Sequence, residues 1–406
     1  MSRLQAKPIQ SQDRDSELQI GSDGSINSTP GPPISILGIR GIPGAHGGFE
    51  TFAENFALYL VGRGWRVTVY CQEHSNDDQQ SSVWESQWHG VRRVHIAVSN
   101  TNAPGTAWFD LKSAVHAAGE EGPVLVLGYN TAVLAPYIRL RGRPVIMNMD
   151  GIEWKRAKWS LPIRAWLYLN EYVGRFSASH LVADHPDIAA HLERHFLSQS
   201  LTMIPYASDT VIEGEAELLD ELGVEPHRYL VSIARIEPEN SIYEIVEAFS
   251  RRQRGIRLVV LGSLSPETND YHKKVVEAAS EEVAMPGAIY DRRTVSALRF
   301  FALAYCHGHT VGGTNPSLVE ALGAGNVVIA HDNRVNRWVT DNSQLYFRNA
   351  DDIEYYLDQV LGNASEMQKF AEMARAVHSE RYTWEAVHRA YENLLLEYSA
   401  EAHQIP

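Results

Sequence analysis

Two glycine-containing segments could bind an anion through backbone N–H groups. The first is GIRGIPGAHGGFE, residues 38–50, between a predicted strand and a predicted helix. Glycine lets the backbone approach a ligand closely, and N–H groups at a helix N-terminus attract negative charge. A tight structural turn is the alternative, but five glycines in thirteen residues are more than a turn requires. The segment therefore favours ligand contact.

The second segment is HGHTVGGTNPSLVEALGAG, residues 307–325, which leaves a predicted strand and enters a predicted helix. Asn315 suits the cap of that helix, and Pro316 suits its first turn. The N–H groups of residues 316–318 would then receive a diphosphate without a metal ion. Glu320, one turn further on, could accept hydrogen bonds from a vicinal diol such as a ribose. An ordinary capping arrangement is the alternative interpretation.

His307 and His309 alternate along the strand that opens this segment, so their side chains share a face. A metal site would need a third ligand, which the pattern does not supply. Hydrogen bonding to a substrate is favoured. We therefore expect neither a metal ion nor another cofactor.

A third segment, residues 149–176, mixes charge with aromatic side chains. Asp150 follows a predicted strand at its carboxyl end, where open α/β sheets bind ligands. The stretch beyond it resembles a basic amphipathic helix on a membrane surface, and an ordinary helix whose aromatic residues enter the core fits equally well. The cations are Lys155, Arg156, Lys158, Arg164 and Arg175, and the aromatic residues are Trp154, Trp159, Trp166, Tyr168 and Tyr172.

Apolar runs alternate with helical periodicity along the chain, which predicts two successive series of β-α units. Such units build parallel sheets with helices on both faces. The predicted fold is therefore α/β with two doubly wound domains, at residues 34–207 and 208–382. Residues 1–33 predict a disordered leader, and residues 383–406 a closing helix. Strands are expected at 34–40, 65–71, 124–129, 144–151, 181–184, 201–206, 228–236, 256–263, 288–291, 303–309 and 326–331.

Composition excludes several classes of function. The 406 residues carry a net charge of −14, which disfavours nucleic-acid binding because a phosphate backbone demands a basic surface. Two cysteines far apart in sequence fit a reducing compartment. No apolar run approaches the roughly 20 residues of a membrane span, and the N-terminus lacks a signal-peptide pattern. A cytoplasmic protein is expected, with the inner face of the cell membrane as an alternative location.

The order of these motifs resembles the retaining, GT-B-fold, family-four glycosyltransferases. Within them, GIRGIPGAHGGFETF, MDGIEWKRAKW and HGHTVGGTNPSLVEA resemble a bacterial rhamnosyltransferase-like subgroup. The resemblance spans residues 34 to about 398. It implies two Rossmann-like domains that face a central cleft, and a final helix that crosses back onto the first domain.

The resemblance also implies roles for individual residues. Gly47 and Gly48 match glycines that let a helix face the donor phosphates, and Arg235 matches an arginine that contacts the diphosphate. Glu320 matches the second glutamate of a paired-glutamate motif that holds the ribose, and Tyr290 lies in the loop that grips the base. The catalytic candidates are Asp150, Arg235 and Glu320. The other donor-binding candidates are His309, Gly313, Thr314, Asn315, Pro316, Ser317 and Leu318, and the acceptor or membrane side comprises Trp154, Lys155, Arg156 and Lys158.

Two positions depart from the family pattern. Gly312 stands where the motif has its first glutamate, and Asn240 stands where a lysine is usual. Loss of that lysine removes a charge-assisted contact to the leaving diphosphate. The candidate replacements are Arg292, Arg293, His307 and His309.

The resemblance implies transfer of a hexose or deoxyhexose, with retention, in bacterial surface polysaccharide synthesis. L-rhamnose from dTDP-L-rhamnose is the expected donor sugar, with UDP- and GDP-sugars as alternatives. The expected acceptor is a saccharide, free or linked to polyprenyl diphosphate, with peripheral contact to an anionic membrane in the second case. A sugar-nucleotide epimerase or hydrolase, and an inactive nucleotide-sugar-binding protein, are the competing hypotheses.

Overall fold

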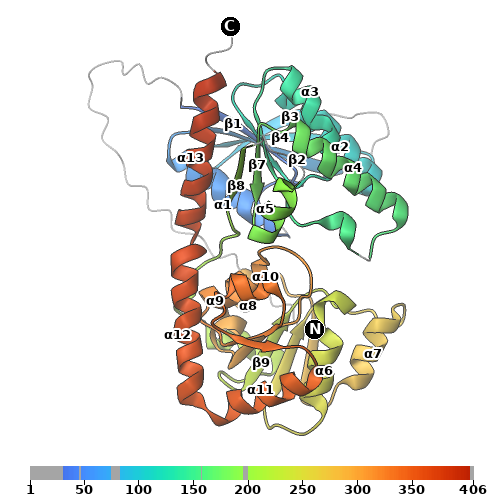
Figure 1. Ribbon diagram of the computed structural model, residues 1–406, viewed down its shortest axis with the longest axis vertical. Helices are drawn as coiled ribbons and strands as arrows, with labels where there is room; N and C mark the ends of the chain where they lie inside the picture. Colours follow the sequence, from blue (N-terminus) through green and yellow to red (C-terminus); the bar gives the residue numbers. More distant parts are fainter. Residues whose placement is uncertain (1–30, 45–46, 75–82, 157, 195–199, 403–406) are drawn as a thin grey trace, which may run out of the picture. The chain divides into compact units, whose positions relative to one another are not determined.

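The computed structural model describes residues 31–44, 47–74, 83–156, 158–194 and 200–402 (Figure 1). The chain divides into Met1–Gly31 and Pro32–Pro406, and every element below lies in the second part. The predicted leader lies outside the described residues as far as residue 30, and so do residues 403–406 of the closing segment.

In the described part of the chain, the first domain contains an eight-stranded sheet in the order β3-β4-β2-β1-β5-β6-β7-β8. Every neighbouring pair is parallel except β3 with β4. Short apolar runs form its central strands because helices cover both faces. The strands are β1 (Pro33–Leu37), β2 (Arg66–His74), β3 (Val83–Trp88), β4 (Val91–Val98), β5 (Val124–Leu127), β6 (Val145–Asn148), β7 (His180–Ala183) and β8 (Ser200–Met203).

The sheet separates the core of this domain into two apolar clusters. One contains Phe52 and Phe56 of the first helix, and the other contains Phe109, Ile138 and Leu167 of the next three. The helices are α1 (Gly48–Gly62), α2 (Ala103–Ala117), α3 (Ala135–Leu140), α4 (Leu161–Ser177) and α5 (Pro186–Glu193), with 3-10 turns η1 (Ala132–Leu134) and η2 (Glu153–Lys155).

The second domain repeats this plan with a six-stranded, fully parallel sheet among the described residues, in the order β11-β10-β9-β12-β13-β14. Its strands are β9 (Tyr229–Ile233), β10 (Arg257–Leu261), β11 (Val283–Gly287), β12 (Ala304–His307), β13 (Val328–His331) and β14 (Leu345–Phe347). Its helical elements are η3 (Ala216–Leu222), η4 (Pro238–Asn240), α6 (Ile242–Ser250), α7 (Asp270–Ala278), α8 (Arg292–Phe300), α9 (Pro316–Gly323), α10 (Arg334–Val339) and α11 (Ala350–Gly362).

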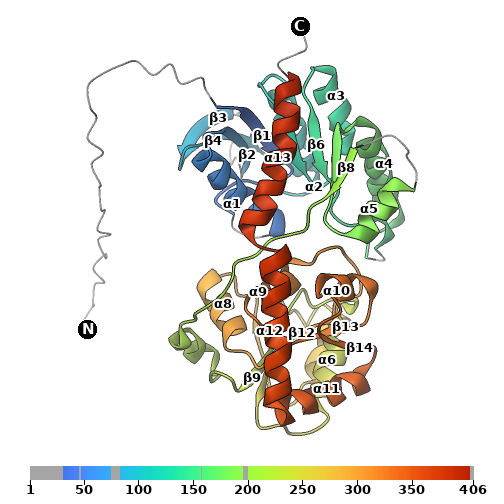
Figure 2. The same cartoon turned by 60° about the vertical axis from the view of Figure 1, so that its left-hand side comes forward.

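Two long helices end the described chain, α12 (Ala364–Arg381) and α13 (Trp384–Ala402) (Figure 2). α12 packs into the core of the second domain, and α13 packs into the core of the first. The ring of Tyr391 lies 4.9 Å from that of Phe52. The buried carboxylate of Glu392 accepts hydrogen bonds from Tyr59 Oη at 2.7 Å and Trp65 Nε1 at 3.1 Å. The last helix therefore completes the core of the first domain.

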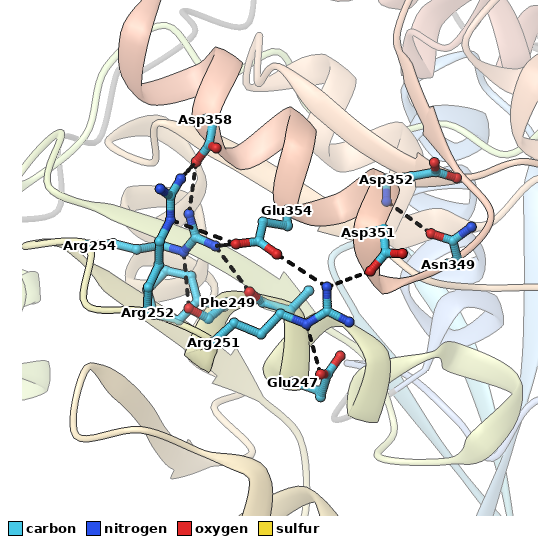
Figure 3. A network of polar contacts seen from close by, with 11 residues as sticks. Glu247, Phe249, Arg251, Arg252, Arg254, Asn349, Asp351, Asp352, Glu354 and Asp358 are labelled. Atoms are coloured by element: carbon cyan, nitrogen blue, oxygen red, sulfur yellow. Dashed lines mark hydrogen bonds and ion pairs between the residues drawn. The ribbon is translucent and has the colours of Figure 1, made fainter.

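A network of charged side chains joins α6 to α11 (Figure 3). Arg251 Nη1 lies 2.6 Å from Asp351 Oδ1 and 3.2 Å from Glu354 Oε2. Arg254, whose side chain is almost fully buried, contacts Asp358 at 3.1 Å. These pairs reinforce helix packing in the second domain.

Several local predictions were wrong or incomplete. The strand expected at 288–291 does not form. Strand β11 ends at Gly287, and Asp291 instead caps α8 by accepting the N–H of Thr294 at 2.8 Å. Strand β3 was not predicted because its side chains are largely exposed and form no apolar run. Strands β4, β11 and β14 were not predicted either.

Candidate functional site

A cavity of about 240 Å³ lies between the two domains. It forms where the loop before α1, the ends of β6 and β7, and the loop before α9 meet. A Cβ atom on Gly48 would lie 3.3 Å from Cγ of Pro316, so the two glycine-containing turns approach closely. The described residues that line the cavity are Gly48, Phe49, Phe52, Asn148, Asp150, Asp184, Ile204, Pro205, Tyr206, Thr314, Pro316 and Tyr391.

The N-terminus of α1 opens at one wall of this cavity. Gly47 precedes the helix with φ of 111°, a conformation that favours glycine, and no side chain of a described residue caps the helix there. A side chain at position 47 would also collide with the Glu50 carboxylate. The N–H groups of the first turn therefore remain available to an anion.

The N-terminus of α9 differs from the prediction. Pro316 has no N–H group, which the sequence argument overlooked. Asn315 caps the helix through its side-chain oxygen, which accepts the N–H of Ser317 at 3.0 Å, and its carbonyl accepts the N–H of Leu318 at 3.1 Å. The N–H groups assigned to the diphosphate at this turn are thus bonded within it, and the Leu318 side chain lies in the core.

An arginine that the sequence analysis missed holds the predicted ribose-binding carboxylate. The buried guanidinium of Arg299 lies 2.5 Å from Glu320 Oε2 and donates to Ser317 Oγ at 3.1 Å. Ser317 Oγ also lies 2.6 Å from the hydroxyl of Tyr305. Arg299 lies in the helical stretch α8, with no motif around it that would have marked it. It fixes the orientation of Glu320, whose own side chain is about one-third exposed.

Two carboxylates line the floor of the cavity. Asp150 adopts φ of 49°, and its N–H donates to Asn148 Oδ1 at 2.8 Å. Burial, together with the charge of Glu153, raises the pKa of Asp150 to about 6. Burial, and then the charge of Asp150, raises the pKa of Asp184 well above its usual range. The Oδ1 atom of Asp184 is buried and has no hydrogen-bond partner among the described residues.

His307 and His309 lie beside each other in the second domain, with ring centroids 4.3 Å apart. Burial lowers the pKa of His309 to about 4, and burial also lowers that of His307 well below its usual value. Both rings are therefore neutral near pH 7. No group of three or more His, Cys, Asp or Glu side chains within the described ranges could hold a metal ion.

Asn240 does not take the place of a lysine, because its buried amide is turned inward and donates to the carbonyl of Arg235 at 2.8 Å. The positive charges near Arg235 come partly from the first domain. Arg156 pairs with Glu153 at 2.5 Å and with Glu239 across the domain boundary. Burial and the charges of Arg156 and Arg235 lower the pKa of Lys158, so these three cations lie near one another.

The three predicted arginines are exposed, and each lies beside a glutamate. Arg235 is 61% exposed and lies 3.5 Å from Glu237. Arg292 lies 3.7 Å from Glu54 of α1, whereas Arg293 pairs with Glu215.

Tyr290 is exposed before α8. Gly313 packs against the Asp184 carboxylate, and its neighbour Gly312 has φ of 127°. Trp154 turns inward and donates to Glu171 at 2.7 Å, with Lys155 above its ring.

Comparison with known proteins identifies the domains. Residues 217–377 match the family described as "Glycosyl transferases group 1", and residues 33–209 match a domain of unknown function (DUF1972). A search of curated proteins found no match.

Similar solved structures share the architecture of the whole chain. Sucrose-phosphate synthase from Thermosynechococcus elongatus has a TM-score of 0.73 at 15% identity and covers 91% of this chain and 100% of its own. Anabaena HepE in complex with UDP and glucose has a TM-score of 0.70 at 14% identity (90% and 100% covered). The UDP-forming trehalose-phosphate synthase from Burkholderia xenovorans has a TM-score of 0.69 at 12% identity and covers 90% of this chain and 100% of its own. The predicted α/β fold with two Rossmann-like domains of the GT-B type is thereby confirmed.

Proposed function

We propose that this chain, whose second domain is a group 1 glycosyltransferase domain, transfers a sugar from a nucleotide-sugar donor to a saccharide acceptor. The observation that carries the proposal is the cavity between the domains, where the uncapped turn at Gly48 meets the turn at Pro316. An uncapped helix N-terminus stabilises a diphosphate that gains charge as it leaves.

In this proposal the donor spans both domains. The diphosphate lies at the first turn of α1, and Arg235 supplies a positive charge from the second domain. Glu320, oriented by Arg299, accepts hydrogen bonds from the ribose hydroxyls. Lys158 supplies the charge that Asn240 lacks, since it lies close to Arg235. Arg156 is less suited because it pairs with both Glu153 and Glu239. The previously considered Arg293 is less suited because it pairs with Glu215.

The transferred sugar lies in the cavity, where Asp150 and Asp184 offer acceptors for its hydroxyl groups. The reaction proceeds with retention: the acceptor attacks from the face that the diphosphate leaves, and a diphosphate oxygen takes the acceptor proton. Closure of the domains excludes water from this step. The donor we favour is dTDP-L-rhamnose, on the motif resemblance. UDP-sugars are the principal alternative because UDP occurs in a structurally similar protein.

The proposal is tested by a thermal-shift screen of the purified chain against dTDP-, UDP- and GDP-sugars, followed by transfer assays with the stabilising donor. A ligand at 100 times its Kd raises the apparent stability by about 2.7 kcal/mol. Stabilisation followed by transfer to a saccharide, with retained anomeric configuration, supports the proposal. Rapid turnover of the donor without any acceptor would instead identify a hydrolase or epimerase, and binding without turnover an inactive binding protein.

A further inference from the structure

Helix α4 exposes its apolar side chains and buries its polar ones, the reverse of an ordinary surface helix. Asn170, Glu171 and Arg175 are among its buried residues. Its large exposed side chains include Leu161 at 77%, Ile163 at 42%, Trp166 at 45%, Tyr168 at 53% and Leu169 at 46% exposure. A cluster of this kind on one helix marks an interaction surface.

The buried polar residues hold the helix in this orientation. The Glu171 carboxylate accepts hydrogen bonds from Trp154 Nε1 at 2.7 Å and from Arg175, and it lies 2.9 Å from His191 Nε2. Asn170 Oδ1 accepts the N–H of Val133 at 3.0 Å. Turning α4 over would break these buried bonds, so its apolar face stays outward.

Helix α3 packs beside α4 (Figure 1) and also carries exposed apolar side chains. Leu140 at its end is 86% exposed, and Tyr137 is 40% exposed. Arg139 and Arg141 flank Leu140, and both are exposed. We call the exposed side chains of Tyr137, Arg139, Leu140, Arg141, Leu161, Ile163, Trp166, Tyr168 and Leu169 the α3–α4 face.

We propose that the α3–α4 face docks onto an anionic lipid surface. Within residues 132–143 and 154–177 the only acidic side chain is Glu171, which is buried, although the whole chain carries a net charge of −14. These two segments therefore expose no carboxylate, in contrast to the acidic chain as a whole. Exposed Trp, Tyr and Leu side chains beside arginines suit the boundary between lipid headgroups and acyl chains.

A second copy of the chain fits this surface less well. In a twofold dimer through the α3–α4 face the same face would lie on both sides of the interface, so neither copy would offer Arg139 and Arg141 an exposed carboxylate from this face. Among the described residues, no helix is long and apolar enough to cross a bilayer.

Membrane docking of the α3–α4 face is independent of the proposed donor site. If the proposed function holds as well, it implies that the acceptor is a saccharide on a lipid carrier. Residues 151–160 connect Asp150 in the cavity to Leu161 at the start of α4. A saccharide on a lipid carrier could therefore reach the cavity from the surface on which α4 lies.

The test is co-sedimentation of the full chain with vesicles of phosphatidylcholine alone or with 30% phosphatidylglycerol. The variant Leu161→Ser/Trp166→Ser removes two apolar side chains from the face. Its matched control is Ile212→Ser/Trp108→Ser, which changes side chains that are 81% and 53% exposed elsewhere. A second pair compares Arg139→Gln/Arg141→Gln with Lys273→Gln/Lys274→Gln on α7.

We expect wild type and both controls to bind the anionic vesicles, and each face variant to bind about tenfold more weakly. Thermal melting of each variant establishes that it is folded. Absence of wild-type binding, or equal binding by face and control variants, overturns the inference. So does a wild-type dimer that Leu161→Ser/Trp166→Ser converts to a monomer without any effect on vesicle binding.

Discussion

Asp184 and Thr314 join the two domains at the wall of the cavity. Asp184 Oδ2 accepts the backbone N–H of Thr314 at 3.1 Å, and the Asp184 carbonyl accepts the Thr314 hydroxyl. Gly313 lies directly against the same carboxylate. The loop that enters α9 is therefore positioned by a side chain from the opposite domain.

Replacing Asp184 tests whether this contact supports donor binding. We expect Asp184→Ala to weaken donor binding by up to about tenfold, because a hydrogen bond contributes about 0.5–1.5 kcal/mol. Asp184→Asn keeps an oxygen that can accept the Thr314 N–H and should stay within about threefold of wild type. Calorimetric titration with the donor identified by thermal shift measures both. Wild-type affinity in the alanine variant would show that the contact has no such role.

Asp150→Asn should make the protein more stable at neutral pH. The folded-state pKa of about 6 lies above the usual 3.8, because the carboxyl is buried and lies near Glu153. Above pH 6 the folded protein therefore carries a buried charge that costs stability, and this cost disappears as the pH falls from 6 to about 4. We expect a gain of roughly 1–3 kcal/mol above pH 6 that vanishes near pH 4.

Asn is a suitable replacement because it tolerates the left-handed backbone conformation at this position. Thermal unfolding of wild type and Asp150→Asn between pH 4 and pH 8 measures the difference. A gain that is independent of pH would contradict the assigned pKa. Transfer activity should fall in the same variant if Asp150 contacts the sugar or the acceptor.

Glu320 should be tested with glutamine rather than alanine. Alanine leaves the buried Arg299 guanidinium without its ion-pair partner, which we expect to cost about 1–3 kcal/mol of stability. Glutamine retains an acceptor for Arg299 and removes only the charge. We expect Glu320→Gln to melt close to wild type and to transfer sugar more than tenfold more slowly. Near-native turnover by this variant would remove Glu320 from the donor site.

Arg235→Ala should impair transfer without affecting the fold, because its side chain is 61% exposed and its pair with Glu237 is a surface contact. We expect transfer to fall more than tenfold. Arg293→Ala is the matched control, since Arg293 is 67% exposed and also pairs with a glutamate, Glu215. Initial rates over a range of donor concentrations compare the two. Equal rates in both variants would contradict a role for Arg235 at the diphosphate.

The repeating β-α pattern predicted most strands of both sheets, because buried parallel strands are short apolar runs bounded by turns. Val145–Asn148 and Val328–His331 are of this kind. Edge elements carry no such pattern, and the exposed strand Val83–Trp88 was missed for that reason. The helix cap at Asn315 was predicted correctly, because Asn followed by Pro suits the start of a helix.

The residues that the sequence did not reveal act through tertiary contacts. Arg299 precedes Glu320 by twenty-one positions, and Asp184 reaches Thr314 across 130 positions. No local pattern records such pairs. The same holds for α4 and the segment before it, which the sequence left open as a membrane-surface helix or an ordinary helix. In the structure, Trp154 is turned inward, whereas Trp166 is exposed.

The anchorage of α13 has a consequence during protein synthesis. Phe52, Phe56 and Trp65 near the start of the chain are covered by side chains between Val387 and Leu395 near its end. The first domain therefore cannot bury these aromatic residues until the chain has been synthesised at least as far as α13. Until then, the nascent chain exposes a surface that molecular chaperones recognise, and a fragment ending at residue 209 would keep that surface permanently.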